Sequence, residues 1–360
     1  MRSLGAILLV AAAAGFAAWR IARPPSAPPT KSVRPAWTGA RVDTADGVTL
    51  VRLAGSPREK GLGHGTRLRE RIRALFEAVQ PKDEGLAALA IETGGKRFAE
   101  RLPTAYAEEI EGIAEGCGLT FEQVLYLNSR FDLRAFELAG GDADSIGFGE
   151  AAAVGAGPEV VRRFHPTDLD GRAAELVVFV SLDDEPLVLV GFPGMVGGFL
   201  GVRGTADRVG GTLRPVQGAV TPALTGLPWP LFLRRLLEQP AAPGDPLPAL
   251  ATIDASIPFV RGGGEMGTLD VSPRGATWHP APGDFAVAHP EPMAGESTIV
   301  REQELDPSRR TLRSERARRV MAGRPAGHLV SVRLRAGSEG VRIAIRRDGL
   351  RFARSIRYRD

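Results

Sequence analysis

The sequence has 360 residues, of which 43% are hydrophobic and 24% charged, with a formal net charge of +4. This composition is that of an ordinary globular protein and excludes a disordered or fibrous chain. The single cysteine, Cys117, excludes an internal disulfide and a cysteine-based zinc cluster, and the histidines show no metal-ligand spacing. Since phosphate-binding and dinucleotide-binding fingerprints are also missing, we expect no metal and no cofactor.

The first 23 residues have the pattern of an export signal. A basic start, Met1-Arg2, precedes an uncharged apolar run over residues 4–19, which Arg20 and Arg23 close. This run is short for a membrane span and typical of a signal-peptide core. No clear small-residue cleavage site follows, so a cleaved signal peptide and an uncleaved signal-anchor both stay open. Either one predicts an extracytoplasmic protein, periplasmic or secreted, and an uncleaved signal-anchor would tether it to the membrane.

Residues 24–40 are rich in proline and predict a stiff tether, and residues 41–360 predict one domain. The domain begins with a strand at 48–53. A helix is then expected from Ser56 to about Val79, because Ser56 and Glu59 form a capping box around a proline at the first helical position.

Two further helices are expected before residue 130. One covers 104–117 and stops at Gly118, and the next begins with the capping box of Thr120 and Gln123 and runs through Leu127. The chain up to about residue 130 is therefore mostly helical.

The second half alternates between short strands and helices. Apolar runs at 176–182 and 186–192, separated by Asp183-Asp184, predict a β-hairpin. Further strands are predicted at 266–271, 276–278 and 285–288, and helices at 229–238, 247–254 and 309–321. Antiparallel strands end the chain, and the whole pattern predicts an α+β layered domain.

The C-terminal segment is basic. From Arg309 to Asp360 there are 16 arginines and 4 acidic residues, and the strands alternate apolar with basic or small side chains. A solvated sheet face and contact with an anionic lipid surface are both open. No nucleic-acid partner is expected, because aromatic residues do not interleave the basic ones and the chain looks exported.

Several blocks, in order along residues 48–330, resemble one family of enzymes. They are Gly55-Ser56 with Gly61, His64 and Gly65; Glu108 to Gly116; Leu125 to Asn128; Phe192 to Gly197; and Leu227 to Pro230 followed by Leu233-Arg234-Arg235. The series is similar to that of the acyl-coenzyme A:6-aminopenicillanic acid acyltransferase-like (isopenicillin N acyltransferase) family of autoproteolytic N-terminal-nucleophile hydrolases.

The resemblance implies a four-layer αββα sandwich of two antiparallel sheets. It also implies a precursor that cuts itself before its nucleophile, whose new α-amine then acts as the base. A hydroxyl or thiol is a weak nucleophile until a base takes its proton, and an α-amine has a pKa near neutrality. The domain would then consist of a helical pro-region, 41–144, and a nucleophile-bearing part, 145–360.

The nucleophile position of the family aligns best with Ser145, where the family has cysteine. Serine is an accepted nucleophile in the wider superfamily, so cleavage at Asp144–Ser145 is expected if the site is active. An inert turn serine is the alternative. Cys117 lies in the earlier helix block and is expected to be a core residue, and His64 is expected to be a structural hydrogen-bonding residue.

Three further positions are carried over from the resemblance. Arg162 matches the family's arginine and is suited to orienting the amine or holding a substrate carboxylate. The family's aspartate position holds His165, which cannot supply a fixed negative charge. Asp168 takes that role only if the turn at Pro166 brings it back.

The oxyanion position departs furthest from the family, because Glu265 stands in place of an asparagine. Losing one amide donor typically costs about 2.7–4 kcal/mol of transition-state stabilisation. An ionised Glu265 would also repel the developing charge. The backbone N–H groups of residues 262–264, all glycine, are an alternative donor. A later block, Ala288 to Met293, likewise holds a glutamate in place of an amide.

Two functions therefore stay open. The first is an amide-bond hydrolase or acyltransferase acting on an acylated amine or peptide-like substrate. The second is a catalytically inactive member of the fold that serves as an envelope-associated binding module. A serine hydrolase of another type is not supported, because Gly-x-Ser-x-Gly and Ser-x-x-Lys patterns are missing.

Overall fold

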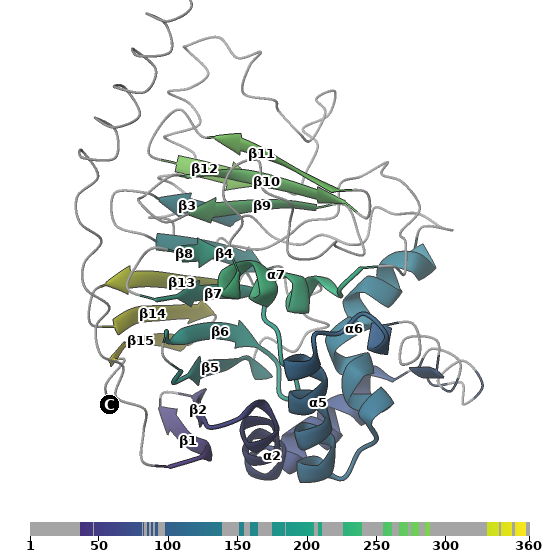
Figure 1. The fold of residues 1–360 in the computed structure, drawn as a ribbon. Helices are drawn as coiled ribbons and strands as arrows, with labels where there is room; N and C mark the ends of the chain where they lie inside the picture. Colours follow the sequence, from purple (N-terminus) through teal and green to yellow (C-terminus); the bar gives the residue numbers. More distant parts are fainter. Residues whose placement is uncertain are drawn as a thin grey trace, which may run out of the picture. The chain divides into compact units, whose positions relative to one another are not determined.

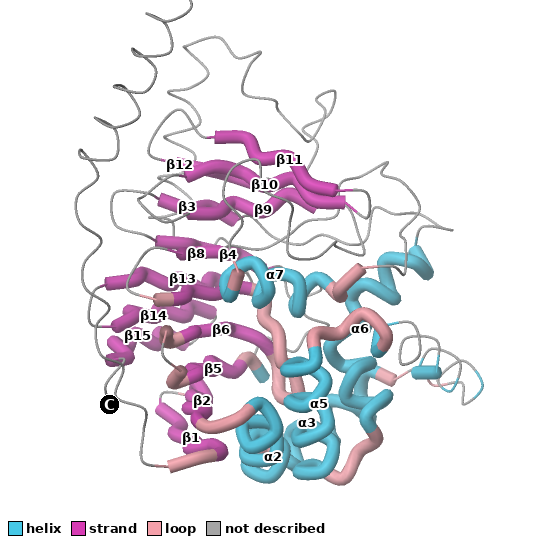
Figure 2. Tube along the Cα trace, in the orientation of Figure 1, coloured by secondary structure: helices cyan, strands magenta, loops and turns pink. Residues whose placement is uncertain are grey.

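The computed structural model contains helices and two β-sheets, an α+β arrangement (Figures 1 and 2). It describes residues 37–45, 47–80, 82, 85, 88, 91–92, 98–138, 151–154, 159–164, 175–183, 185–204, 208–210, 226–239, 255–260, 266–272, 275–280, 285–288, 330–337, 340–347 and 350–357. All of these residues belong to one compact unit, Arg34–Asp360. The predicted α+β class is confirmed.

The larger sheet has nine strands in the order β1-β2-β5-β6-β7-β8-β9-β10-β11. Their bounds are β1 Gly39–Ala45, β2 Val48–Ala54, β5 Val177–Ser181, β6 Leu187–Gly191, β7 Leu200–Arg203, β8 Arg208–Gly210, β9 Ala255–Val260, β10 Met266–Ser272 and β11 Gly275–Pro280. The pairing of β2 with β5 is parallel, which corrects the expectation of a purely antiparallel sheet. A parallel pair needs a long crossover, and the helices between β2 and β5 provide it.

The smaller sheet has six antiparallel strands in the order β12-β3-β4-β13-β14-β15. Their bounds are β3 Ala151–Val154, β4 Glu159–Phe164, β12 Phe285–Ala288, β13 Val330–Gly337, β14 Gly340–Arg347 and β15 Leu350–Arg357. Strands of the two sheets contact one another, with β13 against β7, β4 against β8, and β3 and β12 against β9.

The helices lie against the larger sheet (Figure 1). They are α2 Pro57–Arg67, α3 Arg69–Val79, α5 Thr104–Cys117, α6 Phe121–Leu138 and α7 Trp229–Glu238. Helix α2 contacts β1 and β2, and α7 contacts β7 and β8. The capping boxes predicted at Ser56 and Thr120 are confirmed, as is the left-handed Gly118, with φ of 74°, at the end of α5.

Two predicted helix bounds were wrong. The single helix expected to Val79 breaks at Leu68, whose φ of −112° and ψ of 17° separate α2 from α3 while its side chain stays buried. The helix expected to end at Leu127 continues to Leu138. It continues because the polar residues that follow Leu127 are buried and have internal hydrogen-bond partners.

Most other predicted elements are confirmed. The hairpin at 176–192 is β5 and β6, the helix at 229–238 is α7, and the three later strands are β10, β11 and β12. Strands β1, β3, β7, β8 and β9 were not predicted individually, and β1 begins inside the predicted tether 24–40. The helices predicted at 247–254 and 309–321 lie outside the described residues.

Helices α2 and α5 cross closely because both have glycine at the contact. Gly61 and Gly65 of α2 face Gly112 and Gly116 of α5. A Cβ atom on any of the four would lie closer than 3.0 Å to backbone of the opposite helix. The glycines of two of the resemblance blocks are therefore required by helix packing.

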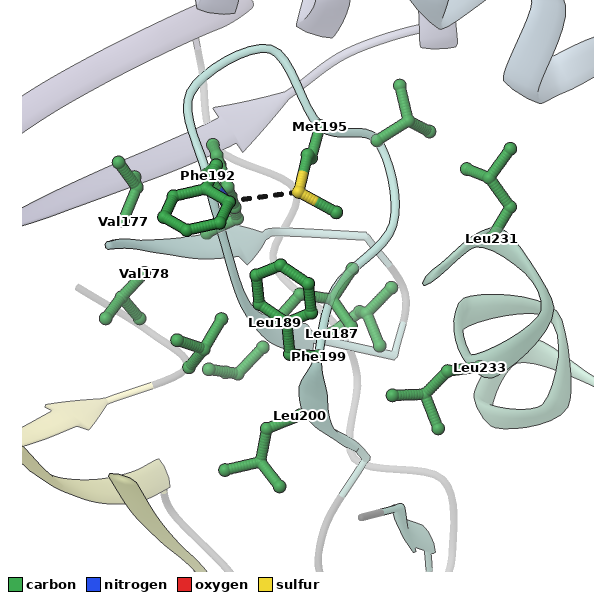
Figure 3. Close-up of a cluster of buried hydrophobic side chains, with 14 of the residues drawn as sticks. Val177, Val178, Leu187, Leu189, Phe192, Met195, Phe199, Leu200, Leu231 and Leu233 are labelled. Atoms are coloured by element: carbon green, nitrogen blue, oxygen red, sulfur yellow. Dashed lines mark hydrogen bonds between the residues drawn. The ribbon is translucent and has the colours of Figure 1, made fainter. Parts of the chain in front are cut away.

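The core is continuous from the strands of the larger sheet to α7. Figure 3 shows Val177, Leu189, Phe199 and Leu233 among the side chains of one buried cluster, with Met195 nearby. Phe192, Phe199 and Trp229 pack as aromatic neighbours, with ring centroids 5.2 Å apart for both Phe192–Phe199 and Phe199–Trp229. Such ring contacts add to the stabilisation that burial provides.

Among the described residues, none of the helices has the length and apolar character needed to cross a membrane. The segment predicted to direct export, residues 1–23, lies outside the described part of the chain.

Candidate functional site

Four strand ends meet at one end of the smaller sheet. In the antiparallel register, Ala151 at the start of β3 lies opposite Arg162 near the end of β4 and opposite Ala288 at the end of β12. Phe164, the last residue of β4, lies opposite the first residue of β13, Val330. The chain therefore enters β3 and leaves β4 and β12 at the same end of the sheet.

Most of the residues predicted for the site lie on these segments, Glu265 being the exception. Ser145 precedes Ala151 by six residues, and His165 directly follows the last residue of β4. The block after Ala288 continues from the end of β12. The strand register thus brings together the attachment points of three segments that are far apart in the sequence.

Arg162 is the one predicted site residue within a described element. It lies on β4, opposite Val332 of β13 as well as Ala151. Residues directly opposite in an antiparallel pair share a face, and the Val332 side chain is completely buried. Position 162 is therefore on the sheet face that carries the core residues of β13. Ser145, His165, Asp168 and Glu265 lie outside the described residues; Glu265 directly precedes β10.

Several other residues of the resemblance blocks form a buried polar joint around residues 192–197, the connection after β6. The backbone N–H of Gly194 donates to His64 Nε2 at 3.1 Å. Asn128 Nδ2 donates to the carbonyl of Gly194 at 3.0 Å, and Asn128 Oδ1 accepts from the N–H of Val196 at 2.7 Å. Gly194 has φ of 84°, a backbone conformation that glycine adopts without strain.

His64 is a neutral structural residue in this joint. Because Nε2 accepts a hydrogen bond, the proton of the imidazole is on Nδ1. Complete burial lowers the pKa of His64 from 6.5 to about 3. Its ring lies against Phe179, with centroids 4.8 Å apart. The expected structural hydrogen-bonding role of His64 is confirmed.

Asp132 continues the joint one helical turn beyond Asn128. Its carboxylate oxygens accept from the backbone N–H of Trp229 at 3.1 and 3.2 Å, at the first residue of α7. An acidic group at a helix N-terminus is also favoured by the helix dipole. Arg130, which lies between Asn128 and Asp132 in the sequence, stacks its guanidinium on the rings of Phe131 and Phe192. The distances to the ring centroids are 4.2 and 5.4 Å.

Arg234 of α7 is the centre of a second buried network. It donates to Glu109 at 2.7 Å, to Glu238 at 2.8 Å and to the carbonyl of Val196 at 3.0 Å. Burial opposes its charge, but Glu109 and Glu238 raise the pKa of Arg234 well above its ordinary value. Tyr106 donates to Glu238 at 2.6 Å, and its ring lies under the guanidinium of Arg234.

The pKa values of the two carboxyl groups of this network are shifted in opposite directions. Burial raises the pKa of Glu109, against the pull of Arg234 and Lys60. For Glu238, burial acts in the same direction, but Arg234 and Tyr106 outweigh it and lower the pKa. The network therefore stabilises a charged arginine inside the protein, where an unpaired charge would be costly.

Lys60 is a further buried cation, besides Arg130 and Arg234, and it joins α2 to the turn after β5. Lys60 is almost fully buried, and its ammonium binds both carboxylate oxygens of Asp183, at 2.5 and 2.7 Å. Ser181 Oγ donates to the same carboxylate at 2.9 Å. The arrangement fixes the predicted β5–β6 turn against the first helix.

Sequence reasoning missed the structural role of Asn128, Asp132 and Arg234. The available signal was the spacing of Asn128 and Asp132, since residues four apart in a helix share a face. Their partners, Gly194 and Trp229, are so distant in sequence that spacing could not identify them.

No group of three or more metal-ligating side chains occurs in the part of the chain that the structure describes. A shallow, open depression lined by residues 66–71 lies at the break between α2 and α3. Cys117 is completely buried, and burial raises the pKa of its thiol. The expectation that Cys117 is a core residue is confirmed.

No family model matches the sequence, and the comparison with curated proteins finds no similar sequence.

Proposed function

We propose that the protein is an amide-bond hydrolase or acyltransferase of the N-terminal-nucleophile type, acting on an acylated amine or peptide-like substrate outside the cytoplasm. The observation that supports it best is the register of the smaller sheet. It leads the segments that carry Ser145, Arg162 and His165 to one end of the β3–β4 hairpin.

In this proposal, cleavage of the Asp144–Ser145 bond frees the α-amine of Ser145. The amine takes the proton of the Ser145 hydroxyl, whose oxygen then attacks the substrate carbonyl. The leaving amine receives the proton, and water or a second amine completes hydrolysis or acyl transfer. Arg162 is the proposed partner of a substrate carboxylate, since a guanidinium binds carboxylates in a bidentate manner.

We propose the four-layer αββα sandwich as the finer description of the fold. The contacts between strands of the two sheets, and the packing of α2 and α7 on the larger sheet, support three of the four layers. The helix layer on the other side of the smaller sheet stays a prediction for β12, β3 and β4 only, because Arg342 of β14 and Arg357 of β15 are exposed on that side.

The position of the proposed cleavage also suits two fragments that remain associated. It falls between α6 and β3, and the hydrogen bonds that His64, Asn128 and Asp132 make with residues 194, 196 and 229 all cross it. The parallel pairing of β2 with β5 and the Glu109–Arg234 ion pair cross it as well. Cleavage would therefore leave the two polypeptides joined by a shared core.

Denaturing electrophoresis tests the proposal. The wild type should give two bands, from fragments of 144 and 216 residues (360 − 144) before any signal removal, with Ser145 at the N-terminus of the second. Ser145→Ala should give one intact chain, whereas the control Ser355→Ala, at an exposed position of β15, should cleave normally. Size-exclusion chromatography without denaturant should show both wild-type fragments in one peak.

The second candidate is a catalytically inactive member of the same fold that serves as an envelope-associated binding module. It is favoured by the sequence at three positions of the proposed site, where serine, His165 and Glu265 replace the cysteine, aspartate and asparagine of the resembled family. A single intact band in the wild type, identical to that of Ser145→Ala, would support this candidate and reject self-cleavage.

We further propose that the protein is exported, on the pattern of residues 1–23. Protease added to intact spheroplasts should digest the protein without prior lysis. Protection from the protease until lysis would contradict export.

A further inference from the structure

The last three strands of the smaller sheet, β13, β14 and β15, are rich in arginine. They lie side by side as an antiparallel meander (Figure 1). They contain eight arginines, two in β13 and three in each of the others, and no aspartate or glutamate. These three strands therefore concentrate positive charge in one part of the sheet.

Strand alternation divides these arginines between two faces. One face carries the buried residues Val332, Leu334, Val341, Ile343, Ile345, Phe352 and Ile356. The opposite face carries the positions between them, where Arg342, Ala353, Ser355 and Arg357 are all exposed. We call it the arginine face; it comprises positions Arg333, Arg335, Arg342, Arg346, Arg351 and Arg357.

The register places like charges directly opposite one another on this face. Arg335 pairs with Arg342, and Arg346 pairs with Arg351. Like charges in such cross-strand pairs destabilise a sheet. On the other side of Arg335 lies Glu159 of β4, the one acidic residue among the register partners of these strands. By contrast, Arg354, on the buried face, binds Asp43 of β1 at 2.5 Å.

We propose that the arginine face docks on the surface of a membrane that contains anionic phospholipids. Phosphate groups would neutralise the opposed arginines, and guanidinium groups bind phosphate oxygens in a bidentate manner. The small residues Ala344, Ala353 and Ser355 between the arginines leave room for headgroups.

The outward positions of the three strands hold no aromatic residue. Binding of single-stranded nucleic acid normally uses aromatic stacking, so a lipid surface fits this face better. Docking on a membrane also agrees with the export signal predicted for residues 1–23. The docking does not depend on enzymatic activity.

Vesicle co-sedimentation of the full-length protein tests this. The probes are vesicles of phosphatidylcholine alone and vesicles that also contain the anionic lipid phosphatidylglycerol. The N-terminal segment, with Arg2, Arg20 and Arg23, is the same in every variant, so the loss of anionic preference relative to the wild type reports the arginine face. Each arginine near an anionic surface contributes about fivefold to binding, so Arg342→Gln with Arg357→Gln should weaken the anionic preference roughly 25-fold.

The matched control removes the same charge elsewhere, with Arg67→Gln and Arg73→Gln, both exposed on α2 and α3. This control should retain the preference for anionic vesicles. For the wild type, 0.5 M salt should abolish that preference, because it shortens the Debye length to about 4 Å. Thermal unfolding without lipid shows whether the variants fold, and the Arg342→Gln chain should be no less stable, since a repulsive pair is removed.

Three results would overturn the proposal. The first is equal wild-type binding to both vesicle types. The second is the same loss in the control as in the arginine-face variant. The third is binding of a soluble polyanion such as heparin with no vesicle preference, which would identify this face as a polyanion site.

Discussion

The imidazole of His64 accepts a hydrogen bond from the backbone N–H of Gly194 across 130 residues of sequence. The two residues belong to separate blocks of the sequence that resemble one family. Their contact attaches α2 to the connection after β6, and Asn128 attaches α6 to the same connection. The resemblance at these positions therefore reflects a buried joint of the scaffold.

Replacing His64 should destabilise the fold, and the loss should be larger where the new side chain cannot accept the hydrogen bond from Gly194. His64→Phe leaves the buried N–H of Gly194 without its acceptor, so we expect a loss of about 1–3 kcal/mol in the free energy of unfolding. His64→Gln retains an acceptor and should lose less. Urea denaturation at pH 7 measures both, with Leu62→Ala, at an exposed position of the same helix, as a near-neutral control. Equal losses for Phe and Gln would contradict the hydrogen-bond account.

His64 should also make stability depend on pH. The unfolded imidazole takes a proton near pH 6.5, whereas burial lowers the pKa of the folded one to about 3. Between these values the unfolded state binds more protons, so stability falls as the pH falls, by up to about 1.4 kcal/mol per pH unit. Denaturation curves from pH 7 to pH 4 should show a shallower decline for His64→Gln than for the wild type. Parallel declines would show that His64 titrates normally.

Gly65→Ala tests the close crossing of α2 and α5. In an exposed helix, this change would stabilise by about 1 kcal/mol through helix propensity. Here the new Cβ would collide with the backbone of α5 near Ile113. We expect a loss of about 1–3 kcal/mol, the usual cost of overpacking, and a lower thermal midpoint. A rise in the midpoint would mean that the helices are farther apart than the structure shows.

Removing the charge of Arg234, at the centre of the second buried network, should lower the free energy of unfolding more than removing the charge of Glu109. Arg234→Met leaves two buried acidic groups without their partner, and such a change typically costs about 3–5 kcal/mol. Glu109→Gln leaves Arg234 still bound to Glu238 and should cost less.

A double-mutant cycle between these two changes gives the coupling. The Arg234→Met, Glu109→Gln chain should lose less stability than the sum of the single losses, by about 0.5–3 kcal/mol. Additive losses would show that the ion pair at 2.7 Å contributes nothing of its own.

Cys117 should be inert to thiol reagents in the native state. It is completely buried, and burial raises the pKa of its thiol, so little reactive thiolate is present at neutral pH. An Ellman titration should detect no free thiol until denaturant is added and then one thiol per chain. Cys117→Ala should leave cleavage before Ser145 unchanged. Rapid labelling of the native protein would reopen Cys117 as a candidate nucleophile.

The sequence alone determined the local structure of this protein. Ser56 and Thr120 mark helix starts because their capping partners are three residues away, and Gly118 marks a helix end for an equally local reason. The β5–β6 hairpin and the strands of the C-terminal meander follow from alternation and turn residues within a few positions. Each of these signals depends on neighbours in sequence.

Only the tertiary structure decided which distant segments meet. The parallel pairing of β2 with β5 and the extension of α6 to Leu138 depend on partners more than 60 residues away. From the sequence alone, the helix was expected to end before Asn128. In the structure it continues, because Gly194 and Val196 provide the hydrogen bonds of Asn128. Long-range pairing follows from which apolar faces bury one another and which buried polar groups find partners, and a single sequence contains no local signal of either.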